Sequence, residues 1–131
     1  MPKFSNRSKD KLITCHPKLQ ELFNIVIKNY DCTIIEGRRS NERQEELFHQ
    51  GKSKLKAGKS KHNQAPSLAV DVAPYPINWN DRIKFYHFVG YVKATADQLK
   101  IKIRCGADWD NDNDLHDQTF FDLPHFELIT D

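Results

Sequence analysis

The stretch AVDVA at residues 69–73 places a carboxylate, Asp71, inside a short apolar run. Side chains of an extended strand alternate between its two faces, so Asp71 shares a face with the small Ala69 and Ala73. Val70 and Val72 occupy the opposite face. Burying a carboxylate costs free energy unless a cation or a metal ion compensates its charge. This strand therefore restricts the chain to folds in which a partner group lies beside Asp71.

Two histidines are candidates for that partner. His62 precedes Asp71 by nine residues, and His125 begins a second short strand predicted at 125–129. Alternation along this strand places Glu127 on the same face as His125. Two imidazoles and one carboxylate leave a coordination position open, which is typical of a catalytic zinc site. From these residues alone, an alternative stays open, in which Asp71 caps a turn or pairs with a lysine and the histidines share no role.

Hydrophobic periodicity predicts three helices: one from Pro17 to Tyr30, one from Ser40 or Asn41 to Gln50, and one from Asn80 or Asp81 to Leu99. Short β-branched or apolar runs predict strands at 32–36, 69–73, 101–105 and 125–129. The chain is thus expected to be an α+β protein, with helices packed on a short, mainly antiparallel sheet. Its 131 residues form a single domain, 1–131, in this interpretation.

Composition excludes several classes of function. A net charge of +2 is too small for a nucleic-acid binder, although it can assist docking on an anionic polymer such as cell wall. No apolar run approaches the roughly 20 residues of a membrane span, so no membrane insertion is expected. The N-terminal MPKFSNRSKDKL lacks the apolar segment of a signal peptide, which predicts cytoplasmic synthesis. The widely spaced Cys15, Cys32 and Cys105 are expected to be free thiols.

Four segments carry a family resemblance. SKHNQAPSLAVD (60–71), followed by DLPHFEL (122–128), resembles the S-x-H…A-x-D…[DE]-x-x-H-x-E pattern of the M15 zinc peptidases. EGRRSNERQEELFHQG (36–51) resembles the G-x-R-[ST]…Q…G segment of that family, and GADWDND (106–112) is similar to a segment of its phage endolysins. The likeness runs from about residue 33 to residue 129. One difference is the interval from His62 to Asp71, which is nine residues where the family usually has seven; the extra residues fall in NQAPSL.

The resemblance implies a hedgehog/DD-peptidase-like fold and a zinc ion held by His62, Asp71 and His125. It also implies that Asp122 is the catalytic acid/base and that Arg39 stabilises a developing oxyanion or a substrate carboxylate.

Two further residues, Ser60 and Glu127, are expected to support the site. Ser60 is expected to hydrogen-bond the substrate or the metal-binding loop, with an ordinary loop serine as the alternative. Glu127 is expected to orient a metal ligand from behind, with a surface salt bridge as the alternative.

The family includes D-alanyl-D-alanine carboxypeptidases, vancomycin-resistance dipeptidases and phage L-alanyl-D-glutamate endopeptidases. The resemblance therefore implies a zinc-dependent peptidoglycan hydrolase. The leading prediction is a monomeric L-alanyl-D-glutamate endopeptidase of a bacteriophage or prophage, an endolysin that degrades the cell wall during host lysis. It would have no separate wall-binding module and would reach the wall by a holin-type route.

The runner-up within the same family is a D-alanyl-D-alanine carboxypeptidase, which would share the site. Two alternatives belong to other classes of protein, and the first is a non-catalytic zinc-containing binding module, which would share the fold. Asp122 and Arg39 argue against the binding module, since a pure binder needs neither. A non-haem iron oxygenase shares the ligand set, but it usually has a closer first histidine–carboxylate spacing and a barrel of many strands.

An acidic loop, DWDNDNDLHD at 108–117, suggests a second ion. Four carboxylates alternate as in the first half of a calcium loop: Asp108, Asp110, Asp112 and Asp114. A bound Ca²⁺ would order this loop and thereby help to place Asp122. The alternative is a solvated acidic loop, because the sixth and twelfth positions, Asn113 and Thr119, differ from the usual glycine and glutamate. His116, in the same loop, is a further candidate site residue.

Overall fold

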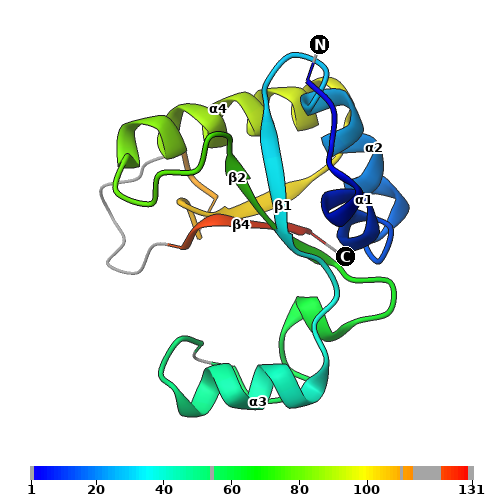
Figure 1. Cartoon of the computed structure of the whole chain (residues 1–131), viewed down its shortest axis with the longest axis vertical. Coiled ribbons are helices and arrows are strands. Elements are labelled where there is room, and N and C mark those ends of the chain that lie inside the picture. Colours follow the sequence, from blue (N-terminus) through cyan, green and yellow to red (C-terminus); the bar gives the residue numbers. More distant parts are fainter. Residues whose placement is uncertain (1, 54, 110, 114–121, 130–131) are drawn as a thin grey trace.

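The structure, a computed structural model, describes residues 2–53, 55–109, 111–113 and 122–129. These residues form four α-helices, a short 3₁₀ turn and a four-stranded sheet (Figure 1). Along the chain the elements are α1 (Asn6–Leu12), α2 (Pro17–Val26), β1 (Cys32–Glu36), α3 (Asn41–His49), η1 (Lys61–Asn63), β2 (Ala69–Pro74), α4 (Arg82–Gln98), β3 (Ile103–Gly106) and β4 (Asp122–Leu128).

The sheet is antiparallel throughout and has the order β1-β2-β4-β3. Its two central strands, β2 and β4, are far apart in the sequence. Their register pairs Val70 with Phe126 and Asp71 with His125. The α+β class with an antiparallel sheet is therefore confirmed, and the predicted strand alternation holds in the centre of the sheet.

Helices α2 and α4 pack on one face of the sheet and close the hydrophobic core (Figure 1). The apolar stripe of α2 includes Phe23, whose ring meets Phe126 of β4 edge to face, with 5.5 Å between centroids. Phe88 of α4 contacts the same Phe126 ring at 6.1 Å. All three rings are fully buried. Aromatic pairs of this geometry add to the free energy gained by burying their area.

Capping side chains fix the helix starts where the sequence indicates them. Pro17 occupies the first turn of α2, and the Ser40 hydroxyl accepts a hydrogen bond from the backbone N–H of Arg43 at the start of α3. Asp81 caps α4 by accepting from the N–H of Lys84. These caps explain why the three predicted helices are confirmed, with ends within a few residues of those expected.

Several elements differ from the sequence prediction; α2, for example, ends at Val26 and not at Tyr30. Helix α1 was not expected, because its sequence NRSKDKL has no apolar stripe; it is capped by Ser5 and buries little beyond Leu12. Strand β3 begins at 103 rather than 101, since the backbone after α4 turns through Lys100 at a φ of 60°. Strand β4 begins at Asp122 rather than His125, so it includes the predicted acid/base residue.

Helix α3 and the loop that follows it lie apart from the sheet (Figure 1). The chain leaves the sheet at the end of β1, forms α3, and returns through η1 to β2. This excursion, residues 37–68, contributes one wall of the site described below.

The three cysteines are buried and unpaired, as predicted. Across the described ranges, no helix combines the length and apolar character that crossing a bilayer requires.

Replacing Phe23 by Ala should cost about 3–5 kcal/mol of unfolding free energy, because the substitution leaves a cavity beneath Phe126. Urea denaturation followed by circular dichroism measures this loss. Ile83→Ala is the matched control, since Ile83 is 84% exposed and should change the stability by no more than about 0.5 kcal/mol. A loss below about 1 kcal/mol for Phe23→Ala would contradict the assigned core.

Candidate metal centre

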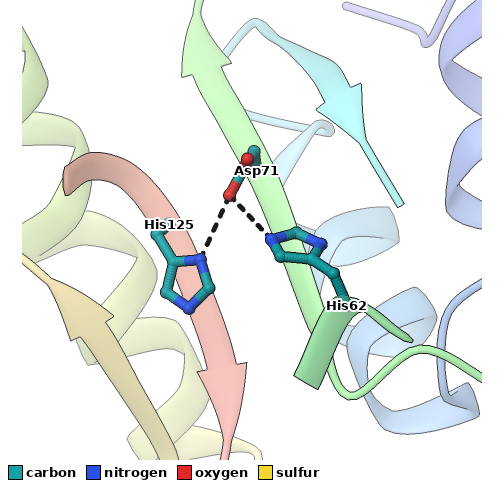
Figure 2. A group of neighbouring side chains, drawn as sticks. All are labelled: His62, Asp71 and His125. Carbon is teal, nitrogen blue, oxygen red and sulfur yellow. Dashed lines mark hydrogen bonds and ion pairs between the residues drawn. The ribbon is translucent and has the colours of Figure 1, made fainter. Parts of the chain in front are cut away.

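Three side chains from separate parts of the chain converge beside the centre of the sheet (Figure 2). Asp71 Oδ1 lies 3.2 Å from His62 Nε2 and 3.2 Å from His125 Nδ1. The cross-strand pairing of β2 with β4 brings Asp71 opposite His125, and η1 carries His62 to the same point. One ligand atom from each residue lies within 4.8 Å of the other two.

Each imidazole is held from behind by a hydrogen-bond acceptor. Nδ1 of His62 donates to the carbonyl oxygen of Gly37 at 2.8 Å, which leaves Nε2 facing Asp71. Nε2 of His125 donates to Glu127 Oε1 at 2.8 Å, which leaves Nδ1 facing Asp71. Acceptors of this kind fix the ring orientation and tautomer of metal-binding histidines. With two nitrogens and one carboxylate oxygen directed to one point, the residues fit a zinc ion.

The charges of the cluster are strongly coupled. Burial alone would raise the pKa of Asp71, but hydrogen bonds from His125 and His62 outweigh burial and hold this pKa well below its usual range. Burial opposes a charge on His125, yet its hydrogen bonds to Asp71 and Glu127 raise the pKa of His125 to about 9. The same pairing lowers the pKa of Glu127 to about 2 against the effect of burial. Without a metal, the cluster therefore holds a proton between Asp71 and His125.

The cluster lies in a cleft of about 560 Å³ between the sheet and the α3 excursion. Leu47, Ser53 and Leu55 line the α3 side. The predicted residues Arg39, Ser60, Asp122 and Glu127 line the cleft together with the three candidate ligands. The structure thus brings together every residue predicted for the zinc site and the chemistry around it.

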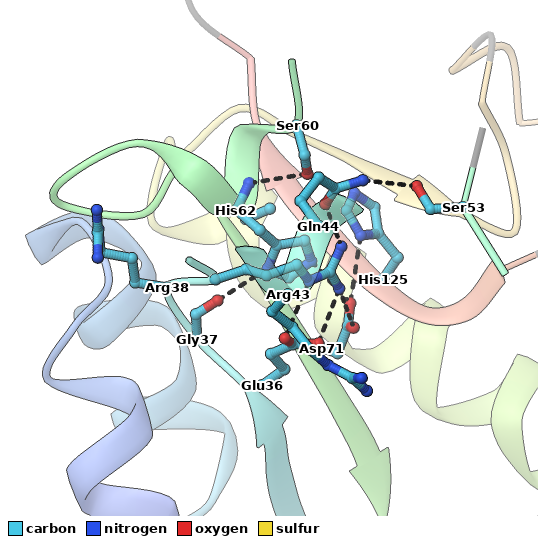
Figure 3. A network of polar contacts seen from close by, with 12 residues as sticks. Glu36, Gly37, Arg38, Arg43, Gln44, Ser53, Ser60, His62, Asp71 and His125 are labelled. Atoms are coloured by element: carbon cyan, nitrogen blue, oxygen red, sulfur yellow. Dashed lines mark hydrogen bonds and ion pairs between the residues drawn. The ribbon is translucent and has the colours of Figure 1, made fainter. Parts of the chain in front are cut away.

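Arg39 is held by a network of buried polar groups. Its Nε and one terminal nitrogen donate to the two carboxylate oxygens of Glu36 at 2.9 and 2.8 Å, and the other terminal nitrogen donates to Gln44 Oε1 at 2.8 Å. Gln44 is completely buried and in turn donates to Ser53 Oγ (Figure 3). The guanidinium also lies 3.6 Å from Asp71 Oδ2. Arg38, by contrast, is exposed and points away from the cluster (Figure 3).

Segment 37–40 and turn η1 are joined by four hydrogen bonds, which we refer to as the staple. His62 Nδ1 donates to Gly37 O, and the Arg39 N–H donates to His62 O at 2.7 Å. Asn63 Nδ2 donates to Arg39 O at 2.9 Å and to Ser40 O at 3.4 Å. The Asn63 side-chain oxygen also accepts from the N–H groups of Gly58 and Ser60. The candidate ligand His62 and Arg39 are therefore positioned by the same set of hydrogen bonds.

The long interval between His62 and Asp71 is accommodated by a loop with its own attachments. Leu68 N–H donates to Lys61 O, and Ser67 exchanges backbone hydrogen bonds with the segment Thr14–His16. These contacts hold the loop NQAPSL in place. His62 and Asp71 therefore still converge, although the interval between them is two residues longer than usual.

Ser60 caps η1 by accepting a hydrogen bond from the N–H of His62 at 3.1 Å. It is buried and lines the cleft, so the structure places it in the turn that carries His62.

Asp122 lies at the start of β4, in close backbone contact with Gly106 of β3. A Cβ atom at Gly106 would come within 1.9 Å of Asp122 O, so only glycine permits this approach. Burial and the neighbouring carboxylate of Asp71 raise the pKa of Asp122, while His125, His62 and Arg39 oppose the rise. A carboxyl group with a raised pKa suits general acid/base chemistry.

Glu127 is 4% exposed and is bound by groups on three sides. Besides His125, its carboxylate accepts hydrogen bonds from Arg104 at 2.9 Å and lies 3.1 Å from Lys61 Nζ. Trp109 covers His125 from the cleft side, with 5.2 Å between ring centroids. Trp109 therefore forms part of the wall of the cleft.

The acidic loop is described only in part, because Asp110, Asp114 and His116 lie outside the described residues. Asp108 is completely buried, and its carboxylate accepts from Lys93 Nζ at 3.2 Å and from the N–H of Asn113 at 2.8 Å. Calcium binding by this loop therefore stays a prediction.

The sequence pattern did not predict three polar residues that organise the site: Glu36, Gln44 and Asn63. Their role depends on contacts between segments, which no local pattern reveals. The only available signal was the glutamine of the G-x-R-[ST]…Q…G resemblance, which corresponds to Gln44.

Comparison with known proteins agrees with this geometry. The model of the phage L-alanyl-D-glutamate peptidase family matches residues 1–129. The L-alanyl-D-glutamate peptidase of Escherichia phage T5 is 35% identical over 136 residues, which cover 97% of this chain and 98% of that protein.

Two solved structures share the fold. The Serratia marcescens L-Ala D-Glu endopeptidase ChiX superposes with a TM-score of 0.78 at 25% identity, over 98% of this chain and 91% of its own. The vancomycin-resistance D,D-pentapeptidase VanY of a VanB-type cassette, solved with Zn(II), gives a TM-score of 0.53 at 16% identity, over 87% and 70% of the two chains. The likeness to VanY concerns the fold alone. With a family model spanning nearly its whole length, the chain belongs to the phage L-alanyl-D-glutamate peptidase family.

Proposed function

We propose that this protein is a zinc peptidase that hydrolyses the L-alanyl-D-glutamate bond in the stem peptides of bacterial peptidoglycan. The observation that carries the proposal is the convergence of His62, Asp71 and His125 in a cleft that also contains Asp122 and Arg39. The relatives named L-alanyl-D-glutamate peptidases support this choice of bond.

His62 Nε2, Asp71 Oδ1 and His125 Nδ1 would hold the zinc ion. When bound, zinc supplies a Lewis acid that polarises the scissile carbonyl and makes a water molecule more acidic. Glu127 and the Gly37 carbonyl keep the two imidazoles oriented for this task.

Asp122 is the proposed proton carrier. Its carboxylate accepts a proton from the attacking water and delivers that proton to the amine of the departing glutamate. The raised pKa of Asp122 favours the second step, because the protonated carboxyl group persists long enough to act as an acid.

Arg39 is the proposed cationic partner of the substrate. Three of the five N–H bonds of a guanidinium are committed here to Glu36 and Gln44. The other two remain for Asp71 or for a substrate oxygen. Because the committed bonds fix the plane of the guanidinium, its charge is in place before substrate binds.

We further propose that the protein acts on the wall after its release from the cytoplasm, as a monomeric endolysin. The phage origin of the T5 relative supports this route. We also propose that calcium binding to the acidic loop regulates the activity. This part of the proposal is supported by the spacing of the aspartates alone.

Digestion of purified sacculi, with mass spectrometry of the released ends, tests the assigned bond. New N-terminal glutamate is the expected product. Release of terminal D-alanine would instead establish a carboxypeptidase, and absence of any release would establish a non-catalytic binding module.

His125→Ala should lose the zinc ion and become less stable, because one of three ligands is missing and zinc binding is coupled to folding. Zinc content by mass spectrometry of the purified protein and the melting temperature measure both effects. His49→Ala is the control, since His49 is an exposed helix residue that does not line the cleft. One equivalent of zinc in His125→Ala would refute this ligand assignment.

Stability should depend on pH in opposite ways with and without metal. In EDTA, the raised pKa of His125 stabilises the protein fully below the unfolded value of 6.5, and this contribution is lost as the pH rises through about 9. The lowered pKa of Glu127 contributes fully above 4.5 and is lost as the pH falls through about 2. The metal-free melting temperature should therefore be highest between pH 4.5 and 6.5.

With zinc, stability should instead increase from pH 6 towards pH 8, because zinc displaces the proton shared by Asp71 and His125. Melting curves across this range, with zinc or with EDTA, measure both trends. If the melting temperature depends on pH in the same way with zinc and with EDTA, the cluster does not bind the metal.

Asp122→Asn should retain zinc and fold normally but lose roughly 10²- to 10⁴-fold in turnover, because the amide cannot accept the proton of water. Hydrolysis of a soluble stem peptide by the zinc-loaded protein measures this change. Asp97→Asn, on the exposed side of α4, is the control. Turnover within a few-fold of the unmodified protein would eliminate Asp122 as the base.

Arg39→Lys should lower kcat by roughly 10²-fold, because an ammonium group cannot bind both oxygens of Glu36 and also reach Gln44. Zinc content should not change, since Arg39 is no ligand. Arg38→Lys is the matched control on the neighbouring residue and should leave hydrolysis of a soluble stem peptide unaltered. Equal kinetics for the two variants would remove Arg39 from the mechanism.

A further inference from the structure

A second groove lies outside the cleft, between helix α1 and strand β1. Its volume of about 500 Å³ is close to the 560 Å³ of the cleft. One wall carries Lys3, Arg7 and Lys11, and the other is formed by residues 31–35. Strand β1 is an edge strand that pairs only with β2, so its outer edge faces α1. There, Ser8 Oγ accepts a hydrogen bond from the N–H of Ile34.

The groove continues towards the candidate metal centre. A smaller adjoining hollow is again lined by Arg7 and Lys11, and it extends to Gly37 and Arg38. Gly37 packs tightly against α1, since a Cβ atom there would lie 2.2 Å from Lys11 O. The carbonyl of the same Gly37 accepts the hydrogen bond from His62. Arg38, which points away from the metal cluster, therefore lies between the groove and the back of the site (Figure 3).

In the described part of the chain, the four basic side chains along this path form no ion pair with a carboxylate: Lys3, Arg7, Lys11 and Arg38. Two acidic residues, Asp10 and Asp31, also line the path, so the four cations are in excess. Arg7 and Lys11 are four residues apart and therefore share one side of α1.

Positive charge is concentrated in this part of the sequence. Residues 1–18 contain five lysines or arginines and one acidic residue, whereas the whole chain has 20 basic and 18 acidic residues. Beyond residue 18, acidic residues are thus in excess. The cleft is lined by four carboxylates and by five lysines or arginines, and three of these cations pair with its carboxylates: Arg39 with Glu36, and Lys61 and Arg104 with Glu127. The cations of the α1 groove therefore provide a separate attraction for an anionic polymer.

We propose that the groove between α1 and β1, continued by Arg38, docks anionic stem peptides of peptidoglycan that are not being cleaved. This inference rests on the proposed function. Glutamate has two carboxyl groups, and a linear stem peptide forms a peptide bond through only one of them. The other remains as a carboxylate that can bind these cations. Binding a neighbouring stem holds the protein on its insoluble substrate and raises the local concentration of scissile bonds.

Co-sedimentation with purified sacculi tests the docking, using full-length protein in the Asp122→Asn background. The groove variant carries Lys3→Gln, Arg7→Gln and Lys11→Gln. The control carries Lys9→Gln, Lys18→Gln and Lys28→Gln, which remove the same charge from exposed residues that line neither hollow. At low salt the groove variant should bind roughly tenfold more weakly, and the control should change less than about twofold. High salt should remove the difference.

Two readouts separate this inference from the proposed function. With Asp122 intact, the groove variant should cleave a soluble stem peptide normally but digest sacculi more slowly. If the unmodified protein cleaves no stem peptide, the proposed function fails, while sedimentation still reports docking. Equal weakening in groove and control variants would overturn the inference, since net charge alone would then explain binding. Weakened binding to DNA or to anionic lipid vesicles, with sacculus binding intact, would also overturn it.

If the triple variant is unfolded by circular dichroism, Arg38→Gln provides the test, because Arg38 lies outside the helix and is exposed. Its sacculus binding should fall about twofold at low salt, and unchanged binding would count against the docking path.

Discussion

The pairing of Asp71 with His125 across the two central strands is the constraint on which the rest of the molecule depends. In an antiparallel sheet, a shift of register by one residue moves every side chain to the opposite face. The same register that joins Asp71 to His125 also pairs Val70 with Phe126, and these two residues point into the core. The hydrophobic contacts of Phe126 with α2 and α4 thus maintain the geometry of the polar face.

The second constraint is electrostatic. Four carboxylates share one small cleft, and three of them have dedicated partners: Glu36 binds Arg39, Asp71 lies between two histidines, and Glu127 binds His125, Arg104 and Lys61. Asp122 is the member whose pKa is raised by its surroundings. The arrangement separates carboxylates that remain ionised from one that can exchange a proton, which is the division that acid/base catalysis needs.

Much of this site could be predicted from sequence because its ligands obey local rules. Alternation along a strand places His125 and Glu127 on one face, and short polar caps mark where α2, α3 and α4 begin. Helix α1 could not be predicted in this way, because it is stabilised by contacts with β1 and Gly37 rather than by an apolar stripe. The roles of Gln44 and Asn63 could not be predicted for a related reason: their partners lie up to 24 residues away in the chain.

The staple between segment 37–40 and η1 has a consequence for how such a protein can diverge. Because these hydrogen bonds close the α3 excursion at its base, residues 41–60 form a cassette whose two ends are fixed at the metal centre. Within the cassette, Gln44 is the residue that must be retained, since it binds Arg39 directly. Insertions or exchanges elsewhere in the cassette would remodel the outer wall of the cleft, and hence substrate choice, while the candidate zinc ligands stay in place.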